Sequence, residues 1–241
     1  MSNSETIKYT CPYCGKEFDV EIYNTVNVSQ DPDLKERCMS GDIFRHSCPH
    51  CHSDFMIQNP LLYEDTEHRF IIWVSAKELG DLSSFAKPLI AKEYTLRRCA
   101  TVKEFVEKIQ IFEDGANDIA VELAKYDSFI DFLDSRKGKA EDVTSIDYVY
   151  TKDDVMKIDI RMDDKGMSFL IPVSGLHDEL EANKEMFEIE DEQFPCINSD
   201  WILSVFMKAQ GNAKSHNVTN RCHNCKIDVH YIIGAGMICP E

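Results

Sequence analysis

The alternation of hydrophobic and polar residues along the chain predicts a mixture of short strands and helices. Hydrophobic residues recur at every second position on both sides of the segment 11–16, and a hydrophobic run covers 69–74, so we expect strands at these places. A further strand is expected over 94–100. A Thr-x-x-Glu capping box then starts one helix at Thr101, and helical spacing predicts a second helix over 117–134.

The second half of the chain continues this mixed pattern. Strands are predicted over 145–150, 155–161 and 167–173, and two helices over 176–187 and 200–210. A last strand is expected over 227–233. Together with a short helix that begins after Asp31 as N-cap and ends at Gly41, these elements predict an α+β fold.

The distribution of charge divides the chain in two. The chain carries 26 basic and 43 acidic residues, a formal net charge of −17. Residues 141–200 hold 17 acidic and only 5 basic residues, whereas the two signs nearly balance over 76–140. A short polar segment at 135–140 lies at this step. We therefore predict domains at 1–135 and 141–241, with a loop inside one domain as the alternative.

Composition also limits the classes of partner. A strongly acidic protein is repelled by phosphate backbones and by acidic lipid, so nucleic acid and membranes are unlikely partners. No hydrophobic stretch is long enough to cross a bilayer, and the polar first residues do not resemble a signal peptide. We therefore expect a cytoplasmic protein whose ten cysteines are metal ligands or buried thiols rather than disulfides.

Four of the cysteines form two Cys-Pro-x-Cys turns, at 11–14 and 48–51, each flanked by hydrophobic and aromatic residues. Both sulfurs of such a turn converge, so two turns supply four thiolates in the arrangement that suits tetrahedral Zn²⁺. The hydrophobic flanks are typical of the hairpins of a zinc ribbon. Four thiolates leave no position for a reactive water, which indicates a structural site. The predicted zinc ligands are Cys11, Cys14, Cys48 and Cys51.

Cys-x-x-Cys pairs also occur in other kinds of site. A redox dithiol needs one Cys-x-x-Cys pair in a thioredoxin-like context, which neither turn has. Residues 48–52 also spell the attachment sequence of c-type haem, but haem attachment requires export and leaves the first turn unexplained. A mononuclear iron or [4Fe–4S] site uses the same four thiolates and stays open. His50 and His52 are alternative ligands that we expect to face solvent.

A second cysteine cluster lies near the C-terminus. Its Cys-x-x-Cys pair is followed by a histidine and, at a longer spacing than usual, by another cysteine. This candidate second metal site consists of Cys222, Cys225, His230 and Cys239. The three remaining cysteines have no partner in the pattern and are interpreted as core or surface thiols: Cys38, Cys99 and Cys196.

The two turns, with Asp-Pro-Asp-Leu-Lys at 31–35 and Pro-Leu-Leu-Tyr at 60–63, resemble the CpXC domain family of prokaryotic proteins. The resemblance covers roughly residues 6–135. It implies a zinc-binding domain and supplies no reaction. In this family a glycine usually follows the second turn, whereas this chain has His52 there.

No linear motif of a nucleotide-binding enzyme, a metalloprotease or a serine hydrolase occurs. The favoured hypothesis is a non-catalytic zinc-binding interaction or regulatory module that contacts a protein. The acidic region is interpreted as a solubilising surface, with docking of a basic partner as the alternative. One alternative is an enzyme with an inter-domain site and no linear motif. The other is a thiol redox or metal-sensing switch.

Overall fold

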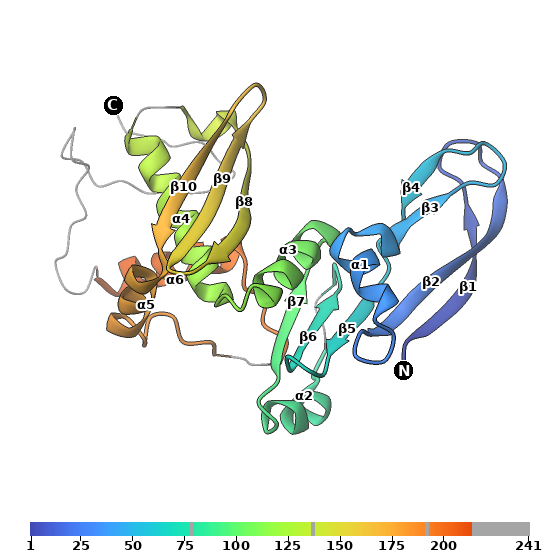
Figure 1. The fold of residues 1–241 in the computed structure, drawn as a ribbon, viewed down its shortest axis with the longest axis horizontal. Coiled ribbons are helices and arrows are strands. Elements are labelled where there is room, and N and C mark those ends of the chain that lie inside the picture. Colours follow the sequence, from blue (N-terminus) through green and yellow to red (C-terminus); the bar gives the residue numbers. More distant parts are fainter. Residues whose placement is uncertain (78–79, 136–137, 191–192, 214–241) are drawn as a thin grey trace. The chain divides into compact units, whose positions relative to one another are not determined.

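The computed structural model describes residues 1–77, 80–135, 138–190 and 193–213, and the chain divides into two compact units (Figure 1). Unit 1 comprises Met1–Gln110 together with Ile189–Cys196. Unit 2 comprises Ile111–Glu188 and the segment that begins at Ile197. These limits differ from those of the domains expected at 1–135 and 141–241. Those two domains stay a prediction about which parts of the chain fold independently.

Unit 1 is built on a five-stranded sheet whose strand order is β1-β2-β5-β6-β7. The pairs β1–β2 and β5–β6 are antiparallel, whereas β2–β5 and β6–β7 are parallel. The strands are β1 (Asn3–Thr10), β2 (Glu17–Asn27), β5 (Leu61–Asp65), β6 (Phe70–Val74) and β7 (Thr95–Cys99). β6, which has a strand on each side, is buried at every position except Trp73, which explains its continuous hydrophobic run.

The helices of unit 1 lie in the connections between these strands. The connection from β2 to β5 contains α1 (Asp33–Met39) and a short 3-10 helix, η1 (Asp42–Phe44). α2 (Ser83–Ile90) joins β6 to β7. α3 (Val102–Glu113) follows the last strand of the sheet, and its end, from Ile111 on, belongs to unit 2. Gly41 ends the first helix with a φ of 76°, a left-handed conformation that glycine adopts without strain.

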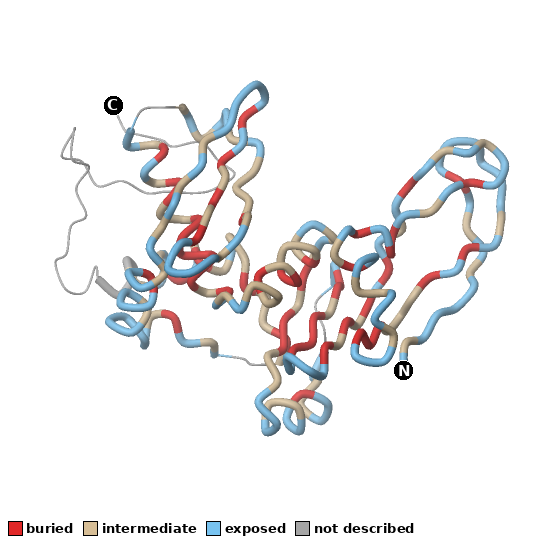
Figure 2. Tube along the Cα trace, viewed as in Figure 1, coloured by how far each residue is buried: buried red, intermediate tan, exposed pale blue. Residues whose placement is uncertain are grey.

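Two hairpins extend from this framework. β2 pairs with β5 only through Thr25–Asn27, so the rest of β2 forms a two-stranded ribbon with β1. β3 (Arg45–Ser47) and β4 (Asp54–Met56) form a separate antiparallel pair. Figure 2 shows that β1 is mostly exposed, and a ribbon of this kind buries too little apolar surface to be stable alone.

The two hairpins share a small aromatic core. The ring of Phe55, on β4, stacks on Tyr9 of β1 with 5.2 Å between ring centroids. Phe18, on β2, meets both rings edge-on at 6.1 and 6.5 Å. Cys11 and Cys48 are buried beside Phe55 in the same cluster. We call β1, β2, β3, β4 and their two turns the hairpin module.

Unit 2 contains a three-stranded antiparallel sheet in the order β10-β9-β8. The strands are β8 (Val143–Lys152), β9 (Val155–Met162) and β10 (Gly166–Pro172). Alternate residues of β9 are buried, and they pack with residues of the long helix α4 (Asp118–Asp134). The fold is completed by η2 (Ala140–Asp142), α5 (Val173–Ala182) and α6 (Ser199–Ala213).

The elements of the described residues include both helices and sheets, which confirms the α+β class. The helix predicted over 117–134 is α4, and the side chain of Asn117 caps it by accepting from the amides of Ile119 and Ala120. Among the strands and α-helices of the described residues, β5 and α2 were missed. The expected cap at Asp31 is wrong, because its carboxylate accepts a hydrogen bond from the Ser2 amide instead. The strand predicted over 227–233 lies outside the described residues.

The polar segment at 135–140, predicted as a linker, joins α4 to η2 within unit 2. Among the described residues, no helix combines the length and the hydrophobicity that a membrane span requires.

The aromatic core predicts how the hairpin module responds to truncation. Phe55→Ala removes a ring that is 8% exposed and contacts both hairpins, so it should lower the free energy of unfolding by about 3 kcal/mol. Met56→Ala, the matched control on the same strand, alters a side chain that is 51% exposed and should cost less than about 0.5 kcal/mol. Denaturant titrations of both variants compare the two values. Equal losses would contradict a shared aromatic core.

Candidate metal centre

Each Cys-Pro-x-Cys turn lies at the tip of one hairpin and is closed by the same backbone hydrogen bonds. In the first turn the Gly15 amide donates to the Cys11 carbonyl at 3.0 Å, and the Cys11 amide donates to the Lys16 carbonyl at 2.9 Å. In the second turn His52 donates to Cys48 at 2.9 Å, and Cys48 donates to the Ser53 carbonyl at 3.0 Å. The two tips therefore repeat one local structure.

The same repetition extends to the sulfur atoms, which accept hydrogen bonds from backbone amides. The amide of Tyr13 donates to Cys11 Sγ and that of His50 to Cys48 Sγ, both at 3.4 Å. The amides of Lys16 and Ser53 donate to the second cysteine of each turn, Cys14 and Cys51. Amide donors stabilise negative charge on sulfur, and a metal binds the thiolate form.

The four sulfur atoms of the two turns converge. Cys11 Sγ lies 3.7 Å from Cys51 Sγ, and Cys14 Sγ lies 3.7 Å from Cys48 Sγ. All four sulfurs lie within 4.8 Å of one another. A tetrahedron with metal–sulfur bonds of about 2.3 Å has edges of about 3.8 Å. The donor set therefore fits a single ion, and the sulfurs are too far apart to be disulfides.

The two sides of this cluster differ in exposure. Cys11 is 2% exposed and Cys48 is fully buried against the aromatic core, because each begins its turn directly after a strand. Cys14 is exposed and Cys51 is half-buried. Each close sulfur pair thus joins one inner cysteine to one outer cysteine of the other hairpin.

The outer cysteines also differ in acidity. The hydroxyl and the amide of Ser53 donate to Cys51 and lower its pKa to about 6. At Cys14, the Lys16 amide lowers the pKa, but desolvation and the neighbouring sulfurs outweigh it and the pKa is about 11. The acidity of Cys51 therefore depends on a hydroxyl that has no counterpart in the first turn, where Lys16 occupies the equivalent position.

His52 takes the backbone role that glycine has in the first turn. Its φ is 59° and that of Gly15 is 71°, so both residues are in the left-handed region. This conformation costs an ordinary L-residue about 1–2 kcal/mol. The departure from the family pattern therefore changes the residue but not the geometry of the turn.

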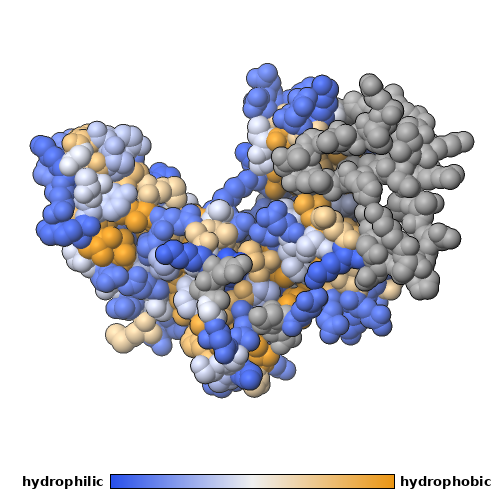
Figure 3. All heavy atoms as spheres, turned by 180° about the vertical axis from the view of Figure 1, so that it is seen from behind, coloured by the Kyte–Doolittle hydropathy of each residue, from blue (hydrophilic) through white to orange (hydrophobic). Residues whose placement is uncertain are grey.

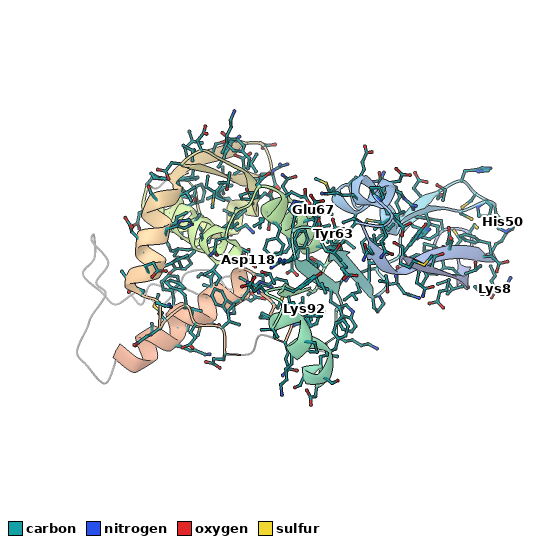
Figure 4. The ribbon with its side chains drawn as sticks, turned by 60° about the horizontal axis from the view of Figure 1, so that its bottom comes forward. Lys8, His50, Tyr63, Glu67, Lys92 and Asp118 are labelled. Atoms are coloured by element: carbon teal, nitrogen blue, oxygen red, sulfur yellow. The ribbon has the colours of Figure 1, made fainter. Side chains whose placement is uncertain are left out.

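The flanking histidines are not among the converging ligands. His50 and His52 are both exposed, and the cluster consists of the four cysteines alone. The ring of His50 lies 6.4 Å from that of Phe18. Figure 4 shows His50 and Lys8 at the far end of the hairpin module, away from Tyr63 in the sheet.

The remaining cysteines lie outside this cluster and differ in their burial. Cys38 and Cys99 are buried, and burial raises the pKa of the Cys38 thiol to about 12. Cys196 is half-buried, so these three cysteines lie in the core or only partly at the surface. The candidate second site lies outside the described residues: Cys222, Cys225, His230 and Cys239.

Sequence reasoning missed the residues that support the cluster rather than form it. Lys16 and Ser53 lie five residues after the first cysteine of their turns and donate to the outer sulfurs. The shared spacing was available in the sequence, but any residue except proline supplies an amide. The identity of the residue at this position therefore does not reveal its role as an amide donor.

Together the fold and the cluster define a protein in which two β-hairpins meet at four convergent cysteines, a hairpin-borne metal-binding module. Residues 9–125, just under half of the chain, match the model of the family described as CpXC protein, so this region is similar to that family. The match confirms the resemblance carried by the two turns. No curated protein and no solved structure matches the chain.

The left-handed residues of the two turns predict substitutions of opposite effect. Gly15→Ala should lower the free energy of unfolding by about 1 kcal/mol, because a Cβ strains the backbone although no atom lies within 4 Å of it. His52→Gly should leave stability unchanged or raise it, since it removes the same strain. Denaturant titrations compare the two variants. A large loss for His52→Gly would mean that the histidine ring, not the backbone, supports the turn.

Proposed function

We propose that Cys11, Cys14, Cys48 and Cys51 bind one structural Zn²⁺ ion and that the hairpin module is a non-catalytic interaction or regulatory module. The observation that carries the proposal is the convergence of four sulfurs within 4.8 Å. Four thiolates complete a tetrahedral shell, so the ion would have no free position for water or substrate. Its role would then be to hold the two hairpin tips together.

Zinc is favoured over the other metals that thiolates bind. In a [4Fe–4S] cluster each thiolate binds a different iron, which places the sulfurs further apart than around a single ion. The 3.7 Å sulfur pairs support a single ion. For one ion in a thiolate site, Zn²⁺ binds more tightly than Fe²⁺ in the usual order of divalent metals.

Metal content is the direct test. Elemental analysis of protein purified without chelator or nickel should find one zinc per chain, and still one after deletion of 222–241. Cys11→Ser should lose the metal and unfold the hairpin module, because metal binding contributes folding free energy. Cys38→Ser, the control, changes a buried thiol outside the cluster and should keep the metal. Iron in place of zinc, or free thiols without metal, would contradict the assignment.

The partner we propose is a protein with a basic surface, and the compartment is the cytoplasm. Acidic residues are frequent and exposed in unit 2, among them Asp153, Asp163, Asp164 and Asp178. The face drawn in Figure 3 is mostly hydrophilic, with hydrophobic residues in several separate areas. Complementary charge accelerates the encounter of two proteins and selects between partners. The same acidic residues repel the phosphate backbone of nucleic acid. Thiols such as exposed Cys14 and buried Cys38 suit a reducing compartment.

A charge-matched pair of variants tests this docking. One variant neutralises the four acidic residues of unit 2 just named, each Asp→Asn. The control neutralises four exposed residues of unit 1: Glu5→Gln, Glu17→Gln, Glu21→Gln and Asp54→Asn. Capture of basic proteins on the full chain should weaken at least several-fold for the first variant and little for the control. Equal losses, or capture that does not weaken with added salt, would contradict docking on unit 2.

A further inference from the structure

We propose that the four-cysteine cluster is a peroxide-responsive site, in which oxidation releases the metal and joins the two hairpins through Cys14–Cys48 and Cys11–Cys51 disulfides. The inference rests on the metal binding proposed above and is independent of any partner. Three observations carry it: the difference in exposure between the sulfurs, the identity of the closest pairs, and the hydrogen bonds that fix each turn.

Exposure determines where a peroxide attacks. Cys14 is exposed and Cys51 is half-buried, whereas Cys11 and Cys48 are shielded by the aromatic core. The residues beside the outer sulfurs, Tyr13 and His50, are themselves exposed, with Tyr13 at 67%. Oxidation of thiolates follows their accessibility to the oxidant. A hydroperoxide therefore meets the outer cysteine of each turn first.

The closest pairs determine which thiol resolves the oxidised one. Cys14 Sγ lies 3.7 Å from buried Cys48 Sγ, and Cys51 Sγ lies 3.7 Å from buried Cys11 Sγ. Each outer sulfur thus has an inner sulfur of the other hairpin at hand. An accessible thiolate next to a resolving thiol is the arrangement that converts a sulfenic acid to a disulfide before further oxidation.

The chemistry balances with hydrogen peroxide as the oxidant. An outer thiolate attacks one peroxide oxygen, the O–O bond breaks, and a sulfenic acid and hydroxide form. The inner thiolate then attacks the sulfenic sulfur, the S–S bond forms and a second hydroxide leaves. Two such events consume two peroxides and four protons and yield two disulfides and four waters. The four sulfurs, now in disulfides, would no longer bind a metal ion, so a bound ion would be released.

The hydrogen bonds of each turn favour bonds between hairpins over bonds within a turn. Amides of the turn hold the sulfurs of Cys11 and Cys48 toward the centre of the cluster, where the other hairpin lies. Closing a pair from 3.7 Å to a bond of about 2.05 Å requires each sulfur to move by less than about 1 Å. The hairpins consequently stay joined after the metal leaves, in contrast to metal removal by a chelator.

The test uses the metal-loaded full chain with Cys222→Ser, Cys225→Ser and Cys239→Ser, titrated with hydrogen peroxide while a zinc indicator reports released metal. We expect one metal released per chain at about two peroxides per chain, the stoichiometry of two disulfides. Peptide mapping should then find Cys14–Cys48 and Cys11–Cys51, with buried Cys38 and Cys99 unmodified as internal controls. A reductant with added zinc should restore the loaded form.

Three outcomes would overturn the inference. They are metal retained at a tenfold excess of peroxide, disulfides within the turns, and sulfinic acids without disulfides. Protein purified without metal would instead contradict the proposed metal site before any peroxide is added.

Limited proteolysis supplies a second measurement that needs no substitution. Cleavage in the two turns, residues 11–16 and 48–53, should be fast after chelation and at least several-fold slower after peroxide, because only the oxidised form keeps the hairpins joined. Equal cleavage of the two metal-free forms would overturn the cross-hairpin pairing.

Discussion

The hairpin module depends on one constraint, the meeting of four sulfurs at the tips of two strand pairs that have little else in common. β3 and β4 are three residues each, and most of β1 is exposed. Their shared core is limited to a few rings and the inner cysteines. So small a core contributes little against the entropy of ordering two hairpins. A metal ion at the sulfurs would supply the missing free energy, which explains why the turns are so closely alike.

The two turns also show how much can vary around a fixed geometry. Their backbone hydrogen bonds coincide, although glycine follows one turn and histidine the other. Lys16 and Ser53 donate the same amide bond, but only serine adds a hydroxyl. The constraint therefore acts on the backbone and the four cysteines. The residues on the outer surface of each turn can vary. The thiols of Cys14 and Cys51 accordingly differ in pKa and in exposure.

Local signals predicted much of this structure, and long-range contacts account for what was missed. The Cys-Pro-x-Cys spacing and the helical spacing over 117–134 act within a few residues, so the turns and α4 were predicted correctly. β5 was missed because its alternation ends in a buried carboxylate, Asp65, which accepts from the His68 ring and two backbone amides. α2 contains Pro88, a residue that ordinarily argues against a helix. The inner sulfur of each turn belongs to the cysteine that directly follows a strand, so it is recognised once the strands are placed.

The position of the second turn within the chain has a consequence for the order of folding. It lies in the crossover between β2 and β5, two strands that pair in parallel through Thr25–Asn27 alone. Parallel pairing across a long connection carries a large loop-closure entropy. If the sulfurs of the two turns join first, they close most of the connection between β2 and β5. Only a shorter loop then remains to be closed when β2 pairs with β5. Metal binding early in folding would thus accelerate the pairing of β2 with β5 in the sheet of unit 1.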